Sequence, residues 1–123
     1  MTEILYKRLS YQVVDAVMEV HRLLGPGFLE AICQTSLAHE LELQGIPFEH
    51  QKRLTVKYKD VVVGDYVPDF FIDGKIIVEI KAASKLNSSH QAQALNYLAA
   101  TGYKLAILLN SGATSLQQHR VVR

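Results

Sequence analysis

The sequence has a single cysteine, Cys33, among its 123 residues. One cysteine cannot form an internal disulfide, and no cysteine and histidine spacing offers a structural zinc site. Residues 1–8 lack the long apolar core of a signal peptide, so we expect a protein of the reducing cytoplasm. The longest apolar runs are only a few residues, which predicts no membrane-spanning segment.

An excess of charge of one sign is also missing. The chain has 13 Lys and Arg residues against 12 Asp and Glu residues, a formal net charge of +1. No global field therefore draws it onto a polyanion, and any affinity for nucleic acid has to be local. Hydrophobic residues make up 49% and charged residues 20%, which is an ordinary globular composition. Without internal repeats or linkers, residues 1–123 are expected to form one domain.

Two helices are expected first. Ser10 can cap a helix that runs to Leu24, and a second helix follows Gly27 until Gly45 and Pro47 close it. Hydrophobic residues then alternate with polar ones from Arg53, which is typical of half-buried strands. Strands are predicted at 53–58, at 61–72 with a kink at Gly64 and an interruption at Pro68, and at 76–82, with a turn at Lys59-Asp60.

The rest of the chain predicts the crossover of an α/β fold. Ser88 and Gln91 form a capping box for a helix that ends near Thr101, and a buried strand follows at 105–110. Residues 116–122 add a last edge strand or a tail. The resulting order, α-α-β-β-β-α-β, predicts a mixed β-sheet flanked by helices, in which the last helix carries the crossover.

A carboxylate and an ammonium interrupt the apolar strand 76–82. Glu79 and Lys81 share one face of that strand, and burying them is costly unless they are paired or bind an ion. One alternative is an internal ion pair between them, with Asp69 as a surface residue beside the turn. The other alternative is a site that also includes Asp69.

The register of the hairpin around Asp73-Gly74 decides where Asp69 lies. With a loop of three residues (73–75), Ile72 pairs with Ile76. Asp69 then falls directly opposite Glu79. A loop of two residues would turn Glu79 to the other face. We expect the first register, in which two adjacent carboxylates repel unless a proton or a divalent cation lies between them, and hard oxygen ligands favour Mg²⁺ or Mn²⁺.

Pro68-Asp69, followed after a short hairpin by Glu79-Ile80-Lys81, resembles the PD-(D/E)xK motif of the restriction-endonuclease-like nuclease superfamily. Residues 19–30, 78–82 and 90–97 widen the match and resemble the GxxExxY proteins, a small branch of that superfamily. The resemblance extends from Leu9 to Asn110. It implies a restriction-endonuclease-like α/β core.

The resemblance also implies a site. Asp69 and Glu79 would be metal ligands, with the carbonyl of Ile80 as a third. Lys81 would orient or activate water, and Glu30, the family's helical glutamate, would complete or position the metal shell. The implied cofactor is Mg²⁺ or Mn²⁺, and the implied substrate is nucleic acid, DNA more than RNA.

Gln93 and Tyr97 lie one helical turn apart and resemble the Gln-x-x-x-Tyr motif of recombination-type exonucleases, where it packs beside the metal site and DNA. We expect them to bind substrate; the alternative is a polar helix face with Tyr97 half-buried. Arg53, Lys57 and Lys59 form a basic strip that suits phosphates, or equally a charged edge that prevents aggregation.

The expected function is metal-dependent hydrolysis of phosphodiester bonds in DNA, by a domain small enough to act as a homodimer. The alternative is a nuclease-fold module without turnover that binds nucleic acid or a protein. Cys33 stands where the GxxExxY pattern has tyrosine and cannot supply a phenol hydrogen bond, which favours the alternative. We interpret Cys33 as a small core residue. The presence of Asp69, Glu79 and Lys81 together favours the enzyme.

Overall fold

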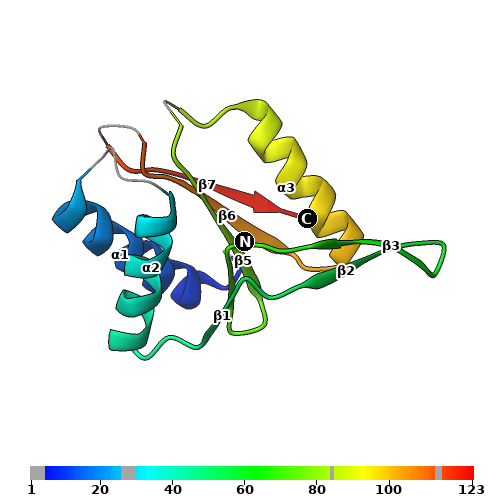
Figure 1. Ribbon diagram of the computed structural model, residues 1–123, viewed down its shortest axis with the longest axis horizontal. Coiled ribbons are helices and arrows are strands. Elements are labelled where there is room, and N and C mark those ends of the chain that lie inside the picture. The colour runs from blue at the N-terminus through cyan, green and yellow to red at the C-terminus, as the bar shows by residue number, and fades with distance from the viewer. Residues whose placement is uncertain (1–4, 26–29, 84, 113–114) are drawn as a thin grey trace.

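A five-stranded mixed sheet with helices on both faces forms the body of the molecule (Figure 1). The computed structural model describes residues 5–25, 30–83, 85–112 and 115–123. The strand order is β1-β4-β5-β6-β7, and β2 and β3 form a separate two-stranded hairpin. The elements are α1 (Lys7–Leu24), α2 (Glu30–Leu43), β1 (Phe48–His50), β2 (Leu54–Tyr58), β3 (Val61–Tyr66), β4 (Phe70–Ile72), β5 (Ile76–Lys81), α3 (Ser88–Thr101), β6 (Leu105–Asn110) and β7 (Gln117–Val122).

The predicted α/β fold with a mixed sheet flanked by helices is confirmed, although the predicted element order was incomplete. The segment 61–72 is two strands in different sheets, because Pro68 has no N–H for a ladder and the chain changes direction there. The short β1 was not predicted, since three residues show no period. The turn at Lys59-Asp60 is confirmed, and a bulge shifts the β2–β3 register next to Gly64.

Both predicted helix caps were wrong. Helix α1 begins before Ser10, whose N–H donates to the Tyr6 carbonyl (2.8 Å), because Leu9 in the preceding turn already packs on the core. Helix α3 has the predicted bounds, but its N-cap is Asn87. The Asn87 side chain accepts the His90 N–H (3.2 Å), and His90 Nδ1 accepts the Asn87 N–H (3.3 Å). Asparagine caps a helix as well as serine does, and here the histidine ring closes the box.

The β4–β5 hairpin has the predicted register. Ile72 pairs with Ile76 across a loop of three residues, and the Lys75 N–H donates to the Ile72 carbonyl (2.9 Å). Asp73 and Gly74 both have positive φ angles, 50° and 66°, which aspartate and glycine adopt most easily. This register fixes which residues of β5 face which helix layer.

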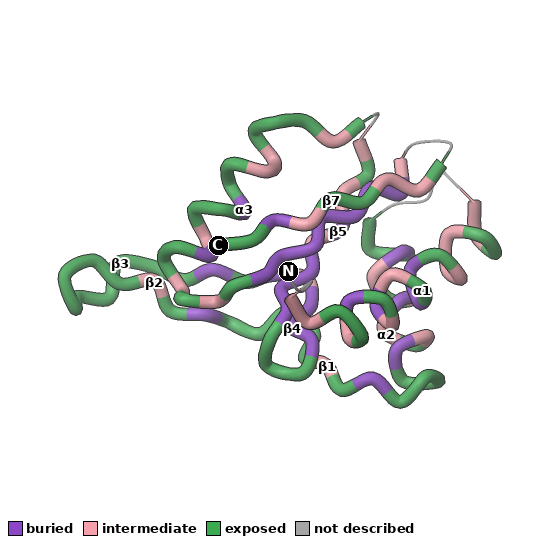
Figure 2. Tube along the Cα trace, turned by 180° about the vertical axis from the view of Figure 1, so that it is seen from behind, coloured by how far each residue is buried: buried purple, intermediate pink, exposed green. Residues whose placement is uncertain are grey.

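Alternate residues of β5 pack on opposite sides of the sheet. Ile76, Val78 and Ile80 join α1 and α2 in one buried cluster, whereas Ile77 lies in a second cluster with α3. Glu79 and Lys81 therefore lie on the α3 side. Strand β5 pairs in parallel with β6, which the crossover through α3 makes possible, and every residue of β6 is buried (Figure 2).

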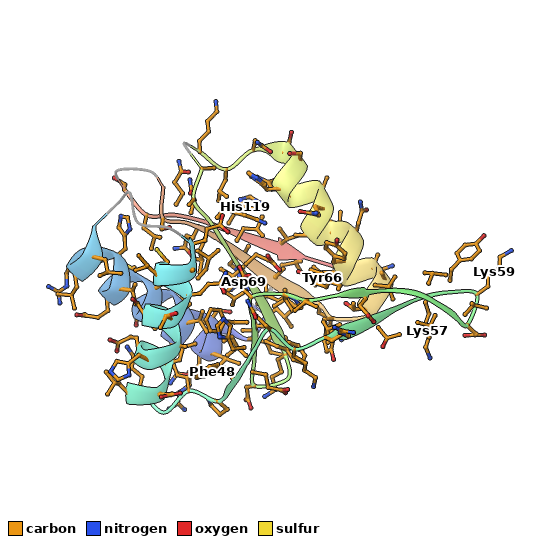
Figure 3. The ribbon with its side chains drawn as sticks, in the orientation of Figure 1. Phe48, Lys57, Lys59, Tyr66, Asp69 and His119 are labelled. Atoms are coloured by element: carbon orange, nitrogen blue, oxygen red, sulfur yellow. The ribbon has the colours of Figure 1, made fainter. Side chains whose placement is uncertain are left out.

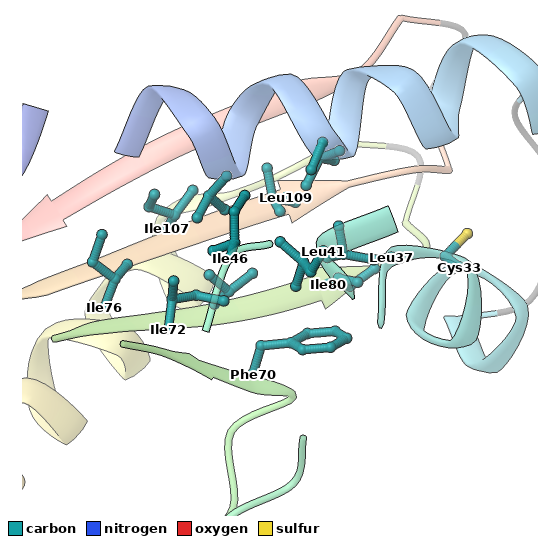
Figure 4. Close-up of a cluster of buried hydrophobic side chains, with 14 of the residues drawn as sticks. Cys33, Leu37, Leu41, Ile46, Phe70, Ile72, Ile76, Ile80, Ile107 and Leu109 are labelled. Carbon is teal, nitrogen blue, oxygen red and sulfur yellow. The ribbon is translucent and has the colours of Figure 1, made fainter. Parts of the chain in front are cut away.

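Cys33 lies in the first cluster, at the end of the group of side chains shown in Figure 4. It is 6% exposed, so its interpretation as a small core residue is confirmed. Its thiol lies 3.3 Å from the Ser111 hydroxyl. In the described part of the chain, no helix is both long and apolar enough to cross a membrane.

Candidate active site

The site begins where β4 and β5 part. Asp69 lies just before β4, and its carbonyl accepts the Gln51 N–H (3.0 Å) rather than continuing the ladder with β5. Its carboxylate is thus able to accept the Ile80 N–H (2.7 Å). In an extended strand the N–H and C=O of one residue point the same way, so the Ile80 carbonyl also faces Asp69.

Glu79 directly precedes Ile80 and lies on the α3 side of β5. Its Oε1 accepts the Tyr66 hydroxyl (2.6 Å), and its Oε2 lies 3.8 Å from the Lys81 Nζ. The two side chains are only 15% and 27% exposed. The ion pair that was one of the two sequence alternatives is thus present, but Asp69 lies beside it rather than on a distant surface.

Both carboxylates are held in conditions that disfavour their charge. Burial raises the pKa of Glu79, and the Asp69 charge raises it further, against the opposing hydrogen bond from Tyr66. Burial also raises the pKa of Asp69, against the Ile80 N–H and the Lys81 charge. The free energy of both ionised groups would fall if a cation lay between them.

Helix α2 supports Asp69 from the other side of the sheet. Gln34 Nε2 donates to Asp69 Oδ1 (3.0 Å), and the Gln34 side-chain Oε1 lies 3.0 Å from His50 Nε2. Glu30 lies one turn earlier on α2, and its carboxylate accepts the Ala82 N–H (3.0 Å). The Glu30 charge adds to the rise in the pKa of Asp69. The Glu30 side chain thus contacts the end of β5 by binding a backbone amide.

A pocket of about 250 Å³ opens between the end of β5, the base of the β2–β3 hairpin and α3. Glu79, Lys81, Gln93 and Tyr97 line it together, so the structure brings these four predicted residues to one place. The Tyr97 ring stacks on the Tyr66 ring, with centroids 3.7 Å apart and planes 4° from parallel. Asp69 and Glu30 lie beside the pocket, nearer α2, and do not line it.

A family model of the PD-(D/E)XK nuclease superfamily matches residues 7–122. The chain belongs to this superfamily. No curated protein matched the chain. Among solved structures it is similar to an alkaline exonuclease (LHK-Exo) from Laribacter hongkongensis, with 14% identity and a TM-score of 0.45, over 100% of this chain and 72% of that one.

The residues of this superfamily member fit a hard divalent cation. Asp69, Glu79 and the Ile80 carbonyl offer oxygen ligands only, which is the donor set that Mg²⁺ and Mn²⁺ prefer. Burial raises the pKa of both carboxylates, and a cation bound beside them would lower both pKa values again. Among the described residues no group of three or more His, Cys, Asp and Glu side chains is suited to hold a metal.

The chain that leaves β5 is fixed by a buried asparagine. Asn110 is fully buried, and its side chain accepts the N–H groups of Ala83 and Gly112 (both 3.0 Å). Its amide donates to the Ala83 carbonyl and to Gln117 Oε1 (both 2.9 Å). All hydrogen-bonding groups of this side chain are satisfied, so the segment after Lys81 is held to the end of β6.

Two contacts of the site were missed by the sequence interpretation. Gln34 follows Glu30 by four residues and so shares its helix face, a spacing that could have indicated it. Tyr66 gave no comparable signal, because it comes from a different sheet and reaches Glu79 only through tertiary packing.

Proposed function

We propose that this superfamily member is a divalent-metal-dependent nuclease that hydrolyses phosphodiester bonds in DNA. The observation that supports the proposal is the convergence of Asp69, Glu79 and Lys81 at the end of β5, beside a pocket walled by α3. We also assign the chain to the GxxExxY branch, on Gly27, Glu30 and the residues around the site, with Cys33 as the departure.

Asp69, Glu79 and the Ile80 carbonyl would hold Mg²⁺ or Mn²⁺. When bound, the metal supplies positive charge that polarises the scissile phosphate and lowers the pKa of a bound water. The chain's own contribution is to hold these oxygens in place. Gln34 and the Ile80 N–H fix both oxygens of Asp69, and Tyr66 fixes one oxygen of Glu79.

Lys81 is the residue we assign to water and phosphate. Its ammonium is at the pocket wall, and Glu79 lies 3.8 Å away, which is longer than a close hydrogen bond and leaves the Nζ able to donate to another oxygen. A lysine in this position can hold the attacking water and stabilise the charge that develops on the phosphate. Glu30 acts as a positioning residue, because it binds the Ala82 N–H directly after Lys81.

Helix α3 is the surface we assign to the substrate strand. Gln93 is exposed at the pocket and offers an amide to a phosphate oxygen, and Tyr97 is half-buried with one ring face fixed by Tyr66. A fixed aromatic ring can contact a sugar or a splayed base with little loss of side-chain freedom. We therefore propose a preference for single-stranded or end-containing DNA over intact duplex.

The rival function is a module that binds nucleic acid or protein without cleaving. One observation favours it: the Glu79–Lys81 ion pair would also form if both residues had only a structural role. The two functions differ in what the loss of one side chain does. In the rival, Lys81→Ala reduces stability and leaves no cleavage to lose.

The deciding experiment is cleavage of labelled single-stranded DNA, closed circular duplex and RNA with Mg²⁺ or Mn²⁺. Wild type should cut linear single strands, and Asp69→Ala should abolish cleavage. Lys81→Ala should lose about 10²–10⁴ in rate while Mn²⁺ still binds in calorimetry. Asp15→Ala, an exposed acid on α1, is the matched control. Wild-type protein that binds DNA and cuts none of the substrates would support the rival.

A further inference from the structure

The β2–β3 hairpin projects away from the body of the molecule, past the end of α3 (Figure 1). Its base is packed: Leu54 and Tyr66 pair directly and are both buried beneath α3. Its outer part is not, because every residue from 57 to 65 is exposed. We call residues 57–63 the hairpin tip.

The tip exposes four large apolar side chains. Tyr58, Val61, Val62 and Val63 are each 59–63% exposed. Tyr58 and Val61 pair on one face of the hairpin, the same face that α3 covers at the base. Val62 lies on the opposite face. Both faces of the tip thus offer apolar surface to a partner, which a purely protective charged edge does not require.

The tip also offers unpaired positive charge. Of the basic strip seen in the sequence, Arg53 is paired with Asp65 (3.3 Å). Neither Lys57 nor Lys59 forms an ion pair within the described residues, and both lie at the far end of the hairpin (Figure 3). The Lys59 ammonium lies 5.5 Å from the centre of the Tyr58 ring.

Ammonium groups beside an aromatic ring suit a strand of phosphates and bases. The same lysines oppose the addition of another β-strand to this edge, which makes a second copy of the chain a poorer occupant. The hairpin is also continuous with the candidate site, because Asp65 and Tyr66 at its base line the pocket beside Glu79.

The length of the hairpin sets the distance from the site. Tyr66 is five positions along the strand from Val61, and a rise of about 3.3 Å per residue gives about 17 Å. That distance corresponds to about five stacked nucleotides at about 3.4 Å each. We propose that the hairpin tip binds the nucleic acid that flanks the cleaved bond, about five nucleotides away from it. The position of the cleaved bond rests on the proposed function, whereas the binding surface does not.

The first test measures DNA binding without divalent metal, by fluorescence anisotropy of labelled single strands and duplexes. Lys57→Gln/Lys59→Gln should weaken binding and reduce the slope of log K against log salt by about 1.4 on single strands or about 1.8 on duplex. The form whose binding loses affinity in this variant is the form that the tip holds. Tyr58→Ala should weaken binding about tenfold. Lys7→Gln, an exposed lysine on α1, is the control and should change neither quantity.

The second test measures cleavage against substrate length. For wild type, kcat/KM should rise until the strand extends about five nucleotides beyond the cleaved bond and then level off. Both tip variants should lose this rise and still match wild type on the shortest strands. Circular dichroism of the variants confirms that they fold.

The outcomes separate the two proposals. Tip variants that bind and cut every length like wild type would overturn the inference about the tip. Tip-dependent binding with no cleavage would overturn the proposed function and retain the tip as a nucleic-acid surface. A wild-type dimer that Val62→Asp converts to a monomer in sedimentation, with DNA affinity unchanged, would make the tip a self-association surface and overturn the inference.

Discussion

Tyr66 ties a carboxylate of the site to the helix proposed to bind substrate. Its hydroxyl donates to Glu79, its ring stacks on Tyr97, and burial together with the Glu79 charge raises its own pKa, so it stays a donor over the working pH range. The buried phenol holds the Glu79 carboxylate in one orientation. Hydrogen-bonding partners that surround metal ligands in proteins act in the same way.

Tyr66→Phe should separate the two contacts, because it keeps the ring and removes the hydroxyl. We expect Mn²⁺ affinity, measured by calorimetry, to fall about 10–100-fold, since Glu79 loses the hydrogen bond that orients it and favours its charged form. Tyr103→Phe, in a half-buried tyrosine that packs against Phe71, is the matched control. Equal Mn²⁺ affinity of Tyr66→Phe and wild type would rule out this orienting role.

The raised pKa of Glu79 predicts a pH dependence of stability in the metal-free protein. The folded-state pKa lies above the unfolded one, so the contribution of this group is full below the unfolded pKa and is lost as pH rises through the folded pKa. Glutamine does not titrate. The free energy of unfolding of wild type minus that of Glu79→Gln should therefore decrease as pH rises from about 4 to about 8.

Urea unfolding in EDTA at several pH values measures this difference. Glu42→Gln, an exposed residue on α2, serves as the reference substitution. A difference that grows with pH would show that the hydrogen bond from Tyr66 outweighs burial, and that Glu79 is stabilised rather than penalised in the folded state.

At the scale of the elements, the β4–β5 hairpin could be predicted from sequence because its information is local. Asp73 and Gly74 favour positive φ angles, and the alternation of Ile76 to Ile80 fixes the faces, so the register follows and with it the neighbourhood of Asp69 and Glu79. The bounds of α3 and β6 were predictable for the same reason, since Gly102 ends the helix and the apolar run is continuous.

The remainder depended on tertiary structure. Pro68 indicates an interruption of the segment 61–72, but no local signal indicates that the first half pairs outside the main sheet, which is what brings Tyr66 under α3. Asn87 and Ser88 are both good N-cap residues, so the sequence does not distinguish them. In the structure the His90 side chain accepts the Asn87 N–H, which makes Asn87 the N-cap. The contacts of Gln34 and Glu30 with Asp69 and Ala82 join residues 35 and 52 positions apart.

Gly112 lies tightly against the backbone of Ala82 and Ala83. A Cβ there would lie 2.4 Å from the Ala83 carbonyl oxygen, so Gly112→Ala must displace the backbone that follows Lys81. We expect a loss of about 1–3 kcal/mol in stability, measured by thermal unfolding, together with weaker Mn²⁺ binding. Gly64→Ala, where the Cβ meets nothing within 4 Å, should change stability by less than about 0.5 kcal/mol. Equal effects of the two substitutions would contradict the close approach.

At the scale of the whole molecule, the proposed metal site would couple folding to metal binding. Unfolding separates Asp69 from Glu79, so a metal that needs both binds only the folded state. At a concentration about 100 times its Kd, Mn²⁺ should add about 2.7 kcal/mol to the free energy of unfolding. Differential scanning calorimetry with and without Mn²⁺ measures the shift. Asp69→Asn should remove it, and an undiminished shift in that variant would place the metal elsewhere.

Asn110 has a consequence for how the molecule opens. Its side chain binds the amides of Ala83 and Gly112, which belong to no strand or helix, and it stands at the end of the buried strand β6. Amides in surface loops usually exchange with solvent deuterium through small local openings, but these two donate to a side chain that is itself fully buried. The exchange of these two amides should therefore be as slow as that of the β6 amides, and hydrogen–deuterium exchange followed by NMR measures both.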